Sequence, residues 1–303
     1  MSAPARQVPA VERPPANDAL LLTLAVLAVS SAPPLIAATV APALAIAFWR
    51  NAGGAIAVVS YALVRNRREL LRMPAPTLGL GLLAGAMLAA HFAAFMGSLR
   101  YTSVASASAL VCSQVVWAAL FGRLAGERLP ARAWAGAALA ILGVLFVTGV
   151  DVSLSPRALG GDLLALLGGV FGGAYIVLGG LVRQSVSTPA YTSVCYSIAA
   201  VLLLVACLVA GLPLAGYAWI DWARIAAVTL LAQLLGHSLF NLVLRSTSPT
   251  LVSLATLFTV PISAVLAALW LAQTPPPAAL PALGLLLAGT ALVISARESP
   301  ADD

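Results

Sequence analysis

The stretch LRYTS at residues 99–103 recurs with a single substitution as LRSTS at residues 244–248, an offset of 145 residues. Two further pairs fall at almost the same offset, Asp18 with Asp162 (144 residues) and Gly143 with Gly289 (146 residues). Each match alone is weak, because Leu, Ser and Gly are abundant in apolar helices. Together and in order, they indicate a duplicated unit.

Both units are strongly apolar. Of 303 residues, 61% are hydrophobic and 9% are charged, against about 25% charged residues in an ordinary soluble domain. A bilayer core about 30 Å thick requires about 20 mostly apolar residues per helix. Ten runs of this kind occur, at about residues 19–39, 43–64, 76–99, 103–124, 131–150, 163–182, 189–210, 222–244, 249–272 and 278–295. We therefore expect an all-α integral membrane protein with ten transmembrane helices.

The repeat predicts how the two halves lie in the membrane. A unit of five helices is odd in number, so its second copy enters the bilayer from the opposite side, which makes two inverted five-helix repeats. Such halves can open a central site alternately to either side, as a carrier requires. The expected divisions are a disordered tail at 1–18, repeats at 19–150 and 158–296 joined by a periplasmic link at 151–157, and a tail at 297–303.

The basic residues indicate orientation. All sixteen are Arg, and they are interpreted as charges at the ends of apolar runs. Only Arg50, Arg100, Arg157 and Arg224 are assigned to the outer side, so the positive-inside rule predicts that both termini are cytoplasmic in a bacterial inner membrane. This distribution does not favour nucleic-acid binding. The tail at 1–18 is too long and mixed for a cleaved signal peptide.

The remaining ionisable residues and cysteines argue against a metal or cofactor. Cys112, Cys195 and Cys207 lie inside apolar runs without ligand spacing. The ten acidic residues are assigned to tails or helix ends, so no carboxylate is expected near the midplane. Ion-coupled carriers commonly use one. We therefore expect a neutral or zwitterionic substrate, moved down its gradient or with proton coupling through His.

Several short motifs carry a family resemblance. They are Phe48-Trp49-Arg50, Arg100-Tyr101-Thr102-Ser103, and Gly126-Glu127-Arg128-Leu129 followed by Gly136 and Gly143, with echoes at 245–248 and 284–289. With these motifs, residues 18–296 resemble the drug/metabolite transporter superfamily in its ten-helix, EamA-type form. The resemblance implies a carrier of small metabolites, and it extends to aromatic amino-acid exporters of the YddG type. Gln273 departs from the pattern where the second repeat would mirror Glu127.

The run at 222–244 carries the clearest polar stripe. Thr229, Gln233, His237 and Asn241 recur every four residues and so share one helix face. Polar side chains inside a membrane usually face a cavity or another helix. The stripe is therefore interpreted as lining a substrate path, and hydrogen bonding between packed helices is the alternative.

Matching helices in the two halves supply the other candidates. Ser113 and Trp117 belong to a stripe along the fourth run, and Ser253 and Thr256 belong to a polar stripe along its counterpart, the ninth run, with helix packing as the alternative role for the serines. His91 lies near the position equivalent to His237, so both could face one cavity or serve as neutral core residues. Together with two aromatic residues, the predicted substrate-binding set is His91, Phe95, Ser113, Trp117, Tyr175, Gln233, His237, Asn241, Ser253 and Thr256.

The sequence thus predicts a secondary transporter that exports small neutral or zwitterionic metabolites by alternating access, with amino acids bearing aromatic or other apolar side chains favoured. A carrier of purines, sugar-like solutes or small cations is the alternative. An intramembrane enzyme is disfavoured, since no H-E-x-x-H, G-x-S-x-G or phosphate-binding loop occurs. A channel is a third reading. The expected partners are the substrate and membrane lipid, a monomer is compatible with the sequence, and no cofactor is expected.

Overall fold

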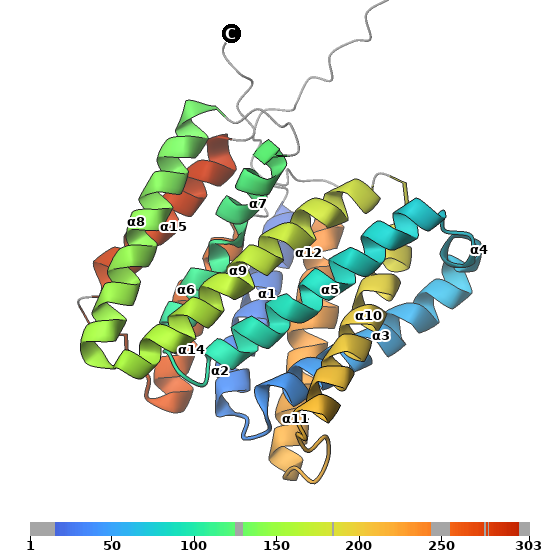
Figure 1. Ribbon diagram of the computed structural model, residues 1–303, viewed down its shortest axis with the longest axis horizontal. Coiled ribbons are helices and arrows are strands. Elements are labelled where there is room, and N and C mark those ends of the chain that lie inside the picture. The colour runs from blue at the N-terminus through green and yellow to red at the C-terminus, as the bar shows by residue number, and fades with distance from the viewer. Residues whose placement is uncertain are drawn as a thin grey trace, which may run out of the picture.

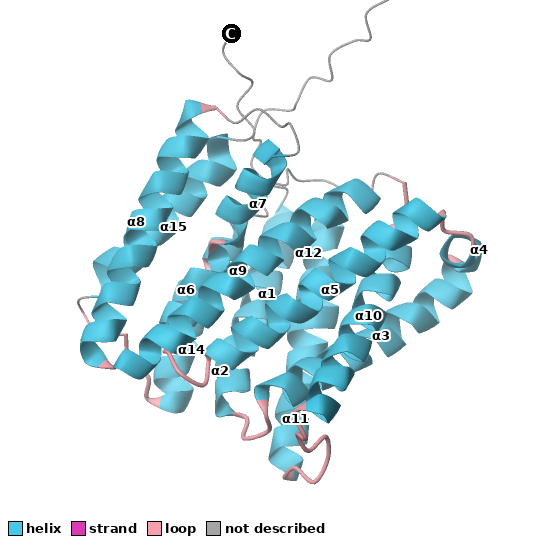
Figure 2. Ribbon diagram, in the orientation of Figure 1, coloured by secondary structure: helices cyan, strands magenta, loops and turns pink. Residues whose placement is uncertain are grey.

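The computed structural model describes residues 16–124, 130–183, 185–243, 255–275, 277 and 279–296. All regular elements in these ranges are helices (Figure 2), which confirms the all-α expectation. The first half contains α1 (Ala16–Ser30), α2 (Ala32–Ala38), α3 (Ala43–Arg65), α4 (Arg67–Leu71), α5 (Ala75–Ser98), α6 (Val104–Cys112), α7 (Gln114–Leu124) and α8 (Ala131–Leu154). The second contains α9 (Pro156–Val182), α10 (Thr188–Val209), α11 (Trp219–Ala227), the π-helix η1 (Val228–Gly236), α12 (His237–Val243), α14 (Thr259–Leu271) and α15 (Ala279–Ala296).

Six helical segments of the described chain are long and apolar enough to cross a membrane, at Asp18–Ala38, Ala43–Arg65, Ala75–Ser98, Val104–Leu124, Pro156–Val182 and Thr188–Val209. Three shorter apolar helices lie at Ala131–Phe146, Ala255–Leu271 and Ala279–Ser295. The outer surface carries many large apolar side chains, among them Leu63, Leu145, Phe146, Leu208 and Leu269. An apolar exterior of this extent is suited to lipid.

Four of the expected membrane helices are interrupted in the described residues, including the ninth, where the turn residue Phe258 precedes α14. The first breaks at Ser31, and Pro33 and Pro34 occupy the first turn of α2, where their fixed φ and missing N–H are tolerated. The fourth breaks at Ser113 between α6 and α7. The eighth changes from α-helix to the π-helix η1, and π-helical turns are frequent at functional sites.

The link between the halves is shorter than the sequence predicted. The expected link at 151–157 is wrong in extent, because Asp151 to Leu154 continue α8 and Pro156 already begins α9. Only Ser155 separates the two helices. Asp162 therefore lies in the second turn of α9, where it is fully buried, and the expectation that it sits at a helix end is corrected.

Helices from the two halves pack in pairs. α8 lies along α15 at the left of Figure 1, α5 runs beside α9 across the centre, and α3 packs against α10. The first pair depends on absent side chains: a Cβ at Gly136 would lie 2.7 Å from the backbone nitrogen of Val293, and one at Gly143 would overlap the backbone of Leu286. Small residues of this kind let membrane helices approach closely.

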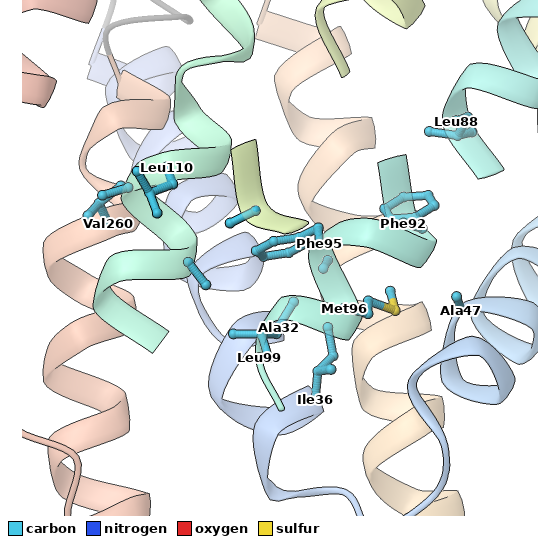
Figure 3. Packing of buried hydrophobic residues seen from close by; sticks show 14 of the residues in the cluster. Ala32, Ile36, Ala47, Leu88, Phe92, Phe95, Met96, Leu99, Leu110 and Val260 are labelled. Carbon is cyan, nitrogen blue, oxygen red and sulfur yellow. The ribbon is translucent and has the colours of Figure 1, made fainter. Parts of the chain in front are cut away.

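The main apolar core joins both halves in the middle of the bundle. Figure 3 shows part of it, including Phe92, Phe95 and Met96 of α5, Leu110 of α6 and Val260 of α14. Because α5, α6 and α14 converge on this core, it fixes the position of helices that also line the cavity described below, and Phe92 and Phe95 belong to both.

Candidate functional site

A cavity with two adjoining lobes lies between the halves. The first lobe has a volume of about 210 Å³ and the second about 320 Å³. Five residues line both lobes, namely Arg50, His91, Phe92, Gln114 and His237. Cavities of this size, with few polar groups among apolar ones, are typical of small-molecule sites.

The first lobe is largely apolar with several hydroxyl groups. Besides the shared residues, its lining consists of Val29, Ala32, Pro33, Phe95, Ser108, Val111, Cys112, Ala232, Phe240, Thr256, Thr259 and Ser263. These side chains come from both sides of the chain midpoint. The lobe therefore can hold an apolar group with hydrogen-bonding positions at its edge.

The second lobe is rich in tyrosine. Its further lining consists of Leu88, Gly172, Tyr175, Ile176, Arg183, Thr188, Tyr191, Thr192, Tyr196 and Gln233. Tyr175 and Tyr191 are stacked, with ring centroids 6.1 Å apart and planes 19° from parallel. Since Arg183 and Thr188 stand at the end of α9 and the start of α10, this lobe reaches that end of the bundle.

Arg50 is the charged residue at the junction of the lobes. It is the eighth residue of α3 and only 4% exposed, so the interpretation of Arg50 as an orienting charge near the outer membrane face is wrong. Its Nε donates to Oε1 of Gln233 at 2.8 Å, and its guanidinium carbon lies 4.4 Å from the centroid of the Phe92 ring. Cation–π contacts of this geometry stabilise a buried guanidinium.

Gln233 reaches Arg50 because α3 offers no side chain in its way. A Cβ at Gly53 would lie 3.1 Å from Thr229, and one at Gly54 would overlap the amide nitrogen of Gln233. The predicted polar stripe is thus brought against α3, with both Thr229 and Gln233 buried. Thr229 donates to the carbonyl of Ile225 within its own helix, so only Gln233 of this pair reaches across.

The two histidines come from different halves of the chain, and both line both lobes. Nδ1 of His91 is 2.8 Å from the carbonyl oxygen of Gly168 in α9, and its ring stacks on Phe95 with centroids 6.1 Å apart. His237 lies at the start of α12, exposed to the cavity, with its ring edge-on to Phe240 at 6.5 Å. Gly172 leaves room for His91 and Gln114, since a Cβ there would lie 2.9 Å from the imidazole and overlap the Gln114 amide oxygen.

The structure brings together six of the ten predicted site residues. The cavity-lining ones are His91, Phe95, Tyr175, Gln233, His237 and Thr256. Ser113 instead donates to the carbonyl of Leu110 at the break between α6 and α7, and Trp117 packs its Cβ against Gly173 of α9. Neither residue lines the lobes. The side chain of Asn241 and the whole of Ser253 lie outside the described residues.

Sequence reasoning missed several lining residues, above all Arg50, Phe92, Gln114, Tyr191 and Tyr196. A signal for Arg50 was present, because a charged residue two turns inside an apolar run is not at a helix end. Phe92 and the tyrosines offered none, because an aromatic residue in a membrane helix packs against helices or lipid as readily as it lines a cavity.

Opposite the tyrosine lobe, hydrogen bonds tie down the turn at residues 39–42. Oδ1 of Asp221 accepts from the backbone N–H of Val40 at 3.1 Å and from Nη1 of Arg224 at 3.2 Å. Arg224 also donates to the carbonyl of Ala38 at 2.7 Å, and Arg100 donates to that of Ala41. Burial lowers the pKa of Arg100, and the negative charge of Asp221 offsets part of this shift. We call this set the turn clamp.

The other end carries a capping carboxylate. Glu69 of α4 accepts hydrogen bonds from the backbone N–H and the hydroxyl of Ser187, the residue before α10, and from Asn66 at 3.2 Å. Partial burial raises the pKa of Glu69, but these hydrogen bonds outweigh it and hold the pKa below the ordinary 4.5. A carboxylate at a helix N-terminus is stabilised by the unpaired N–H groups there.

The charged side chains that line the cavity in the described part of the chain are all positive. The linings include Arg50 and Arg183 but no Asp or Glu from the described part of the chain. The described residues likewise contain no cluster of His, Cys, Asp or Glu able to hold a metal ion. Chemically, the cavity can stack an apolar or aromatic group, donate hydrogen bonds and attract negative charge.

Comparison with known proteins agrees with this arrangement. The model of the EamA-like transporter family matches the chain twice, over residues 18–149 and 159–295. A solved structure described as "Crystal structure of protein" superposes with a TM-score of 0.65 at 20% sequence identity, covering 93% of this chain and 99% of that chain. That likeness shows the fold alone. No curated protein matches the chain in sequence.

Proposed function

Because the chain belongs to the EamA-like transporter family, and so is a membrane transporter of small solutes, we propose that it exports small neutral or zwitterionic metabolites by alternating access, with amino acids bearing aromatic or other apolar side chains as favoured substrates. The observation that carries this proposal is the two-lobed cavity between the halves. Aromatic rings of Phe92, Phe95 and Tyr175 line it beside uncharged hydrogen-bonding groups. Such a lining suits an apolar side chain attached to a polar head.

The halves are proposed to be inverted repeats of five membrane helices each. The separate family matches on either side of Ser155 support this. So do the helix contacts of the described chain: α5 packs on α9 as η1 packs on α1, and α3 packs on η1 as α10 packs on α5. Likewise α6 and α7 contact α9, as α14 contacts α1 and α2. Inverted halves of this kind exchange conformations around a fixed site.

The conformation described is proposed to face the cytoplasm. The tyrosine lobe reaches Arg183 and Thr188, at the end that the positive-inside rule assigns to the cytoplasm. The turn clamp holds the turn at 39–42 against α11 at the opposite end. Opening to the outside would then require that clamp to release while the tyrosine lobe closes. Both termini are proposed to be cytoplasmic, in a bacterial inner membrane.

Coupling is proposed to be absent or to depend on histidine. His91 and His237 are the two imidazoles in the described lining, and imidazole is a side chain that can accept and release protons during a transport cycle. No carboxylate joins them there. Transport would therefore run down the substrate gradient, or move protons only through these two imidazoles.

Efflux from proteoliposomes tests the function. Purified protein is reconstituted into liposomes, which are loaded with radiolabelled phenylalanine or leucine. Adenine and glucose serve as contrasting solutes. Efflux is followed with and without a pH gradient. The proposal predicts that liposomes containing the protein release the amino acids, and that liposomes without the protein do not. It is wrong if none of the amino acids moves, and the coupling proposal is wrong if a strong pH dependence survives in the His91→Gln, His237→Gln double variant.

A further inference from the structure

The burial of Arg50 is not explained by transport of an uncharged solute. Its side chain is 4% exposed, well inside α3. No Asp or Glu of the described residues lines the lobes beside Arg50, and the ion pair of Arg224 with Asp221 does not involve it. A buried charge is costly unless an opposite charge or several hydrogen bonds compensate it. A guanidinium left in this position therefore points to a negatively charged group that binds there.

Unused hydrogen-bond donors lie at this point of the cavity wall. The guanidinium has five N–H groups, and Gln233 accepts only the one on Nε. The amide nitrogen of Gln233 is itself buried and has no hydrogen-bond partner among the described residues. Arg50 lines both lobes and Gln233 lines the second. Two side chains linked to each other thus hold unused donors in the wall of the second lobe.

We propose that Arg50 and Gln233 bind the carboxylate of the transported substrate, an assignment that rests on the function proposed above. The planar fork of a guanidinium matches a carboxylate, with two parallel hydrogen bonds. The Phe92 ring covers one face of Arg50, and Phe95 lies on the same helix in the first lobe. The substrate is therefore a monocarboxylate whose apolar part lies on these rings. Amines and other cations without a carboxylate are excluded by the same charge.

A matched pair of ligands isolates the carboxylate. 3-Phenylpropionate and 3-phenylpropionamide have the same ring and chain, and differ in the negative charge. Binding of each to the purified full-length protein is measured by ligand-induced thermal stabilisation over a concentration series, with L-phenylalanine alongside. Because charge-assisted hydrogen bonds are stronger than neutral ones, the acid should bind about tenfold more tightly than the amide or better.

Three variants locate the preference. Arg50→Gln should reduce the ratio of acid to amide affinity to about one. Gln233→Glu places a carboxylate beside Arg50 in the same shape, so it should also remove the preference while keeping the buried charge paired and the protein folded. Arg132→Gln removes one positive charge from an exposed position on α8, outside the cavity, and should keep the wild-type ratio.

The outcomes separate this assignment from the proposed function. Equal binding of acid and amide by the wild type overturns the carboxylate site even if amino acids are transported, and so does an unchanged ratio in Gln233→Glu. A preference lost in Gln233→Glu but kept in Arg132→Gln supports the site even if Arg50→Gln fails to fold. If the preference follows Arg50 and Gln233 but efflux of every amino acid tested is absent, the site stands and the proposed function fails.

Discussion

Nε of Arg50 in α3 donates a hydrogen bond of 2.8 Å to Oε1 of Gln233 in η1, a residue 183 positions later in the chain. The bond joins the two halves at the wall of the cavity. It forms because Gly54 leaves room for the Gln233 amide and because η1 carries that amide against α3. A movement that separates α3 from η1 would break this bond, so the charge at the centre of the cavity is coupled to the relative position of the halves.

Gly172→Ala should impair transport while leaving the fold intact. Its new Cβ would overlap the Gln114 amide and crowd His91 inside the cavity, both of them side chains that can shift. We expect apparent substrate affinity to fall by about 1 kcal/mol, roughly fivefold. The comparison is Gly180→Ala on the same helix, where a Cβ meets nothing within 4 Å. Initial rates of efflux over a substrate series measure both, and equal effects of the two changes would refute the role given to Gly172.

Gly143→Ala should destabilise the whole protein. Its Cβ would overlap the backbone of Leu286, which cannot move without displacing α15 from α8. Overpacking of this kind costs about 1–3 kcal/mol. Gly284→Ala, on α15 with open space around its Cβ, should leave stability within about 0.5 kcal/mol of wild type. Melting temperatures in detergent report the difference, and a Gly143→Ala variant as stable as Gly284→Ala would contradict the packing described.

Glu69 makes the stability of the folded protein depend on pH, and the direction of its pKa shift gives the sign of that dependence. Its pKa in the folded protein lies below the ordinary 4.5, because Ser187 and Asn66 donate to the charged form. The stabilisation is therefore present above pH 4.5, and it is lost as the pH falls through the lower, folded-state pKa. At pH 7 the melting temperature of the wild type should be higher than that of Glu69→Gln. The difference between the two melting temperatures should narrow as the pH drops below 4.5. A difference that widens on acidification would show that the sign is wrong.

The membrane sidedness of two short connections tests the repeat orientation. Single cysteines at Ser155 and at Asn66, in a background where Cys112, Cys195 and Cys207 are serine, are exposed to an impermeant thiol reagent in intact and in opened cells. Inverted five-helix repeats place these positions on opposite faces. Ser155→Cys should react in intact bacteria with a permeable outer membrane, and Asn66→Cys only after opening. Reaction of both under the same condition would rule out the proposed orientation.

Much of the fold followed from the sequence because it depends on local composition. Apolar run length predicted the helices. Gly143 and Gly289 were used only as markers of the repeat, and the structure places both in the α8–α15 interface. The extent of the link at 151–157 was wrong because Asp151 and Ser153 are residue types common in loops. Their helix propensities are only slightly unfavourable, so the long helix α8 continues through them.

The site was less predictable, since a cavity depends on which faces of different helices meet. The stripe carrying Gln233 and His237 was visible from its period of four, and both residues line the cavity. Trp117 was grouped with them, whereas its Cβ packs against Gly173, and spacing alone cannot distinguish a helix face that packs on another helix from one that lines a cavity. Arg50 was misassigned by counting it with charges at helix ends, although its depth in the apolar run indicated otherwise.

Reciprocal accessibility of the two ends tests alternating access most directly. Cysteine is placed at Thr192 in the tyrosine lobe or at the buried Thr39 beside the turn clamp, in the cysteine-free background, and modification rates are compared with and without Asp221→Asn, which weakens the clamp. We predict that Asp221→Asn speeds modification at position 39 and slows it at position 192. If both rates rise together, or if only position 39 responds, the two ends open independently and the mechanism proposed here is contradicted.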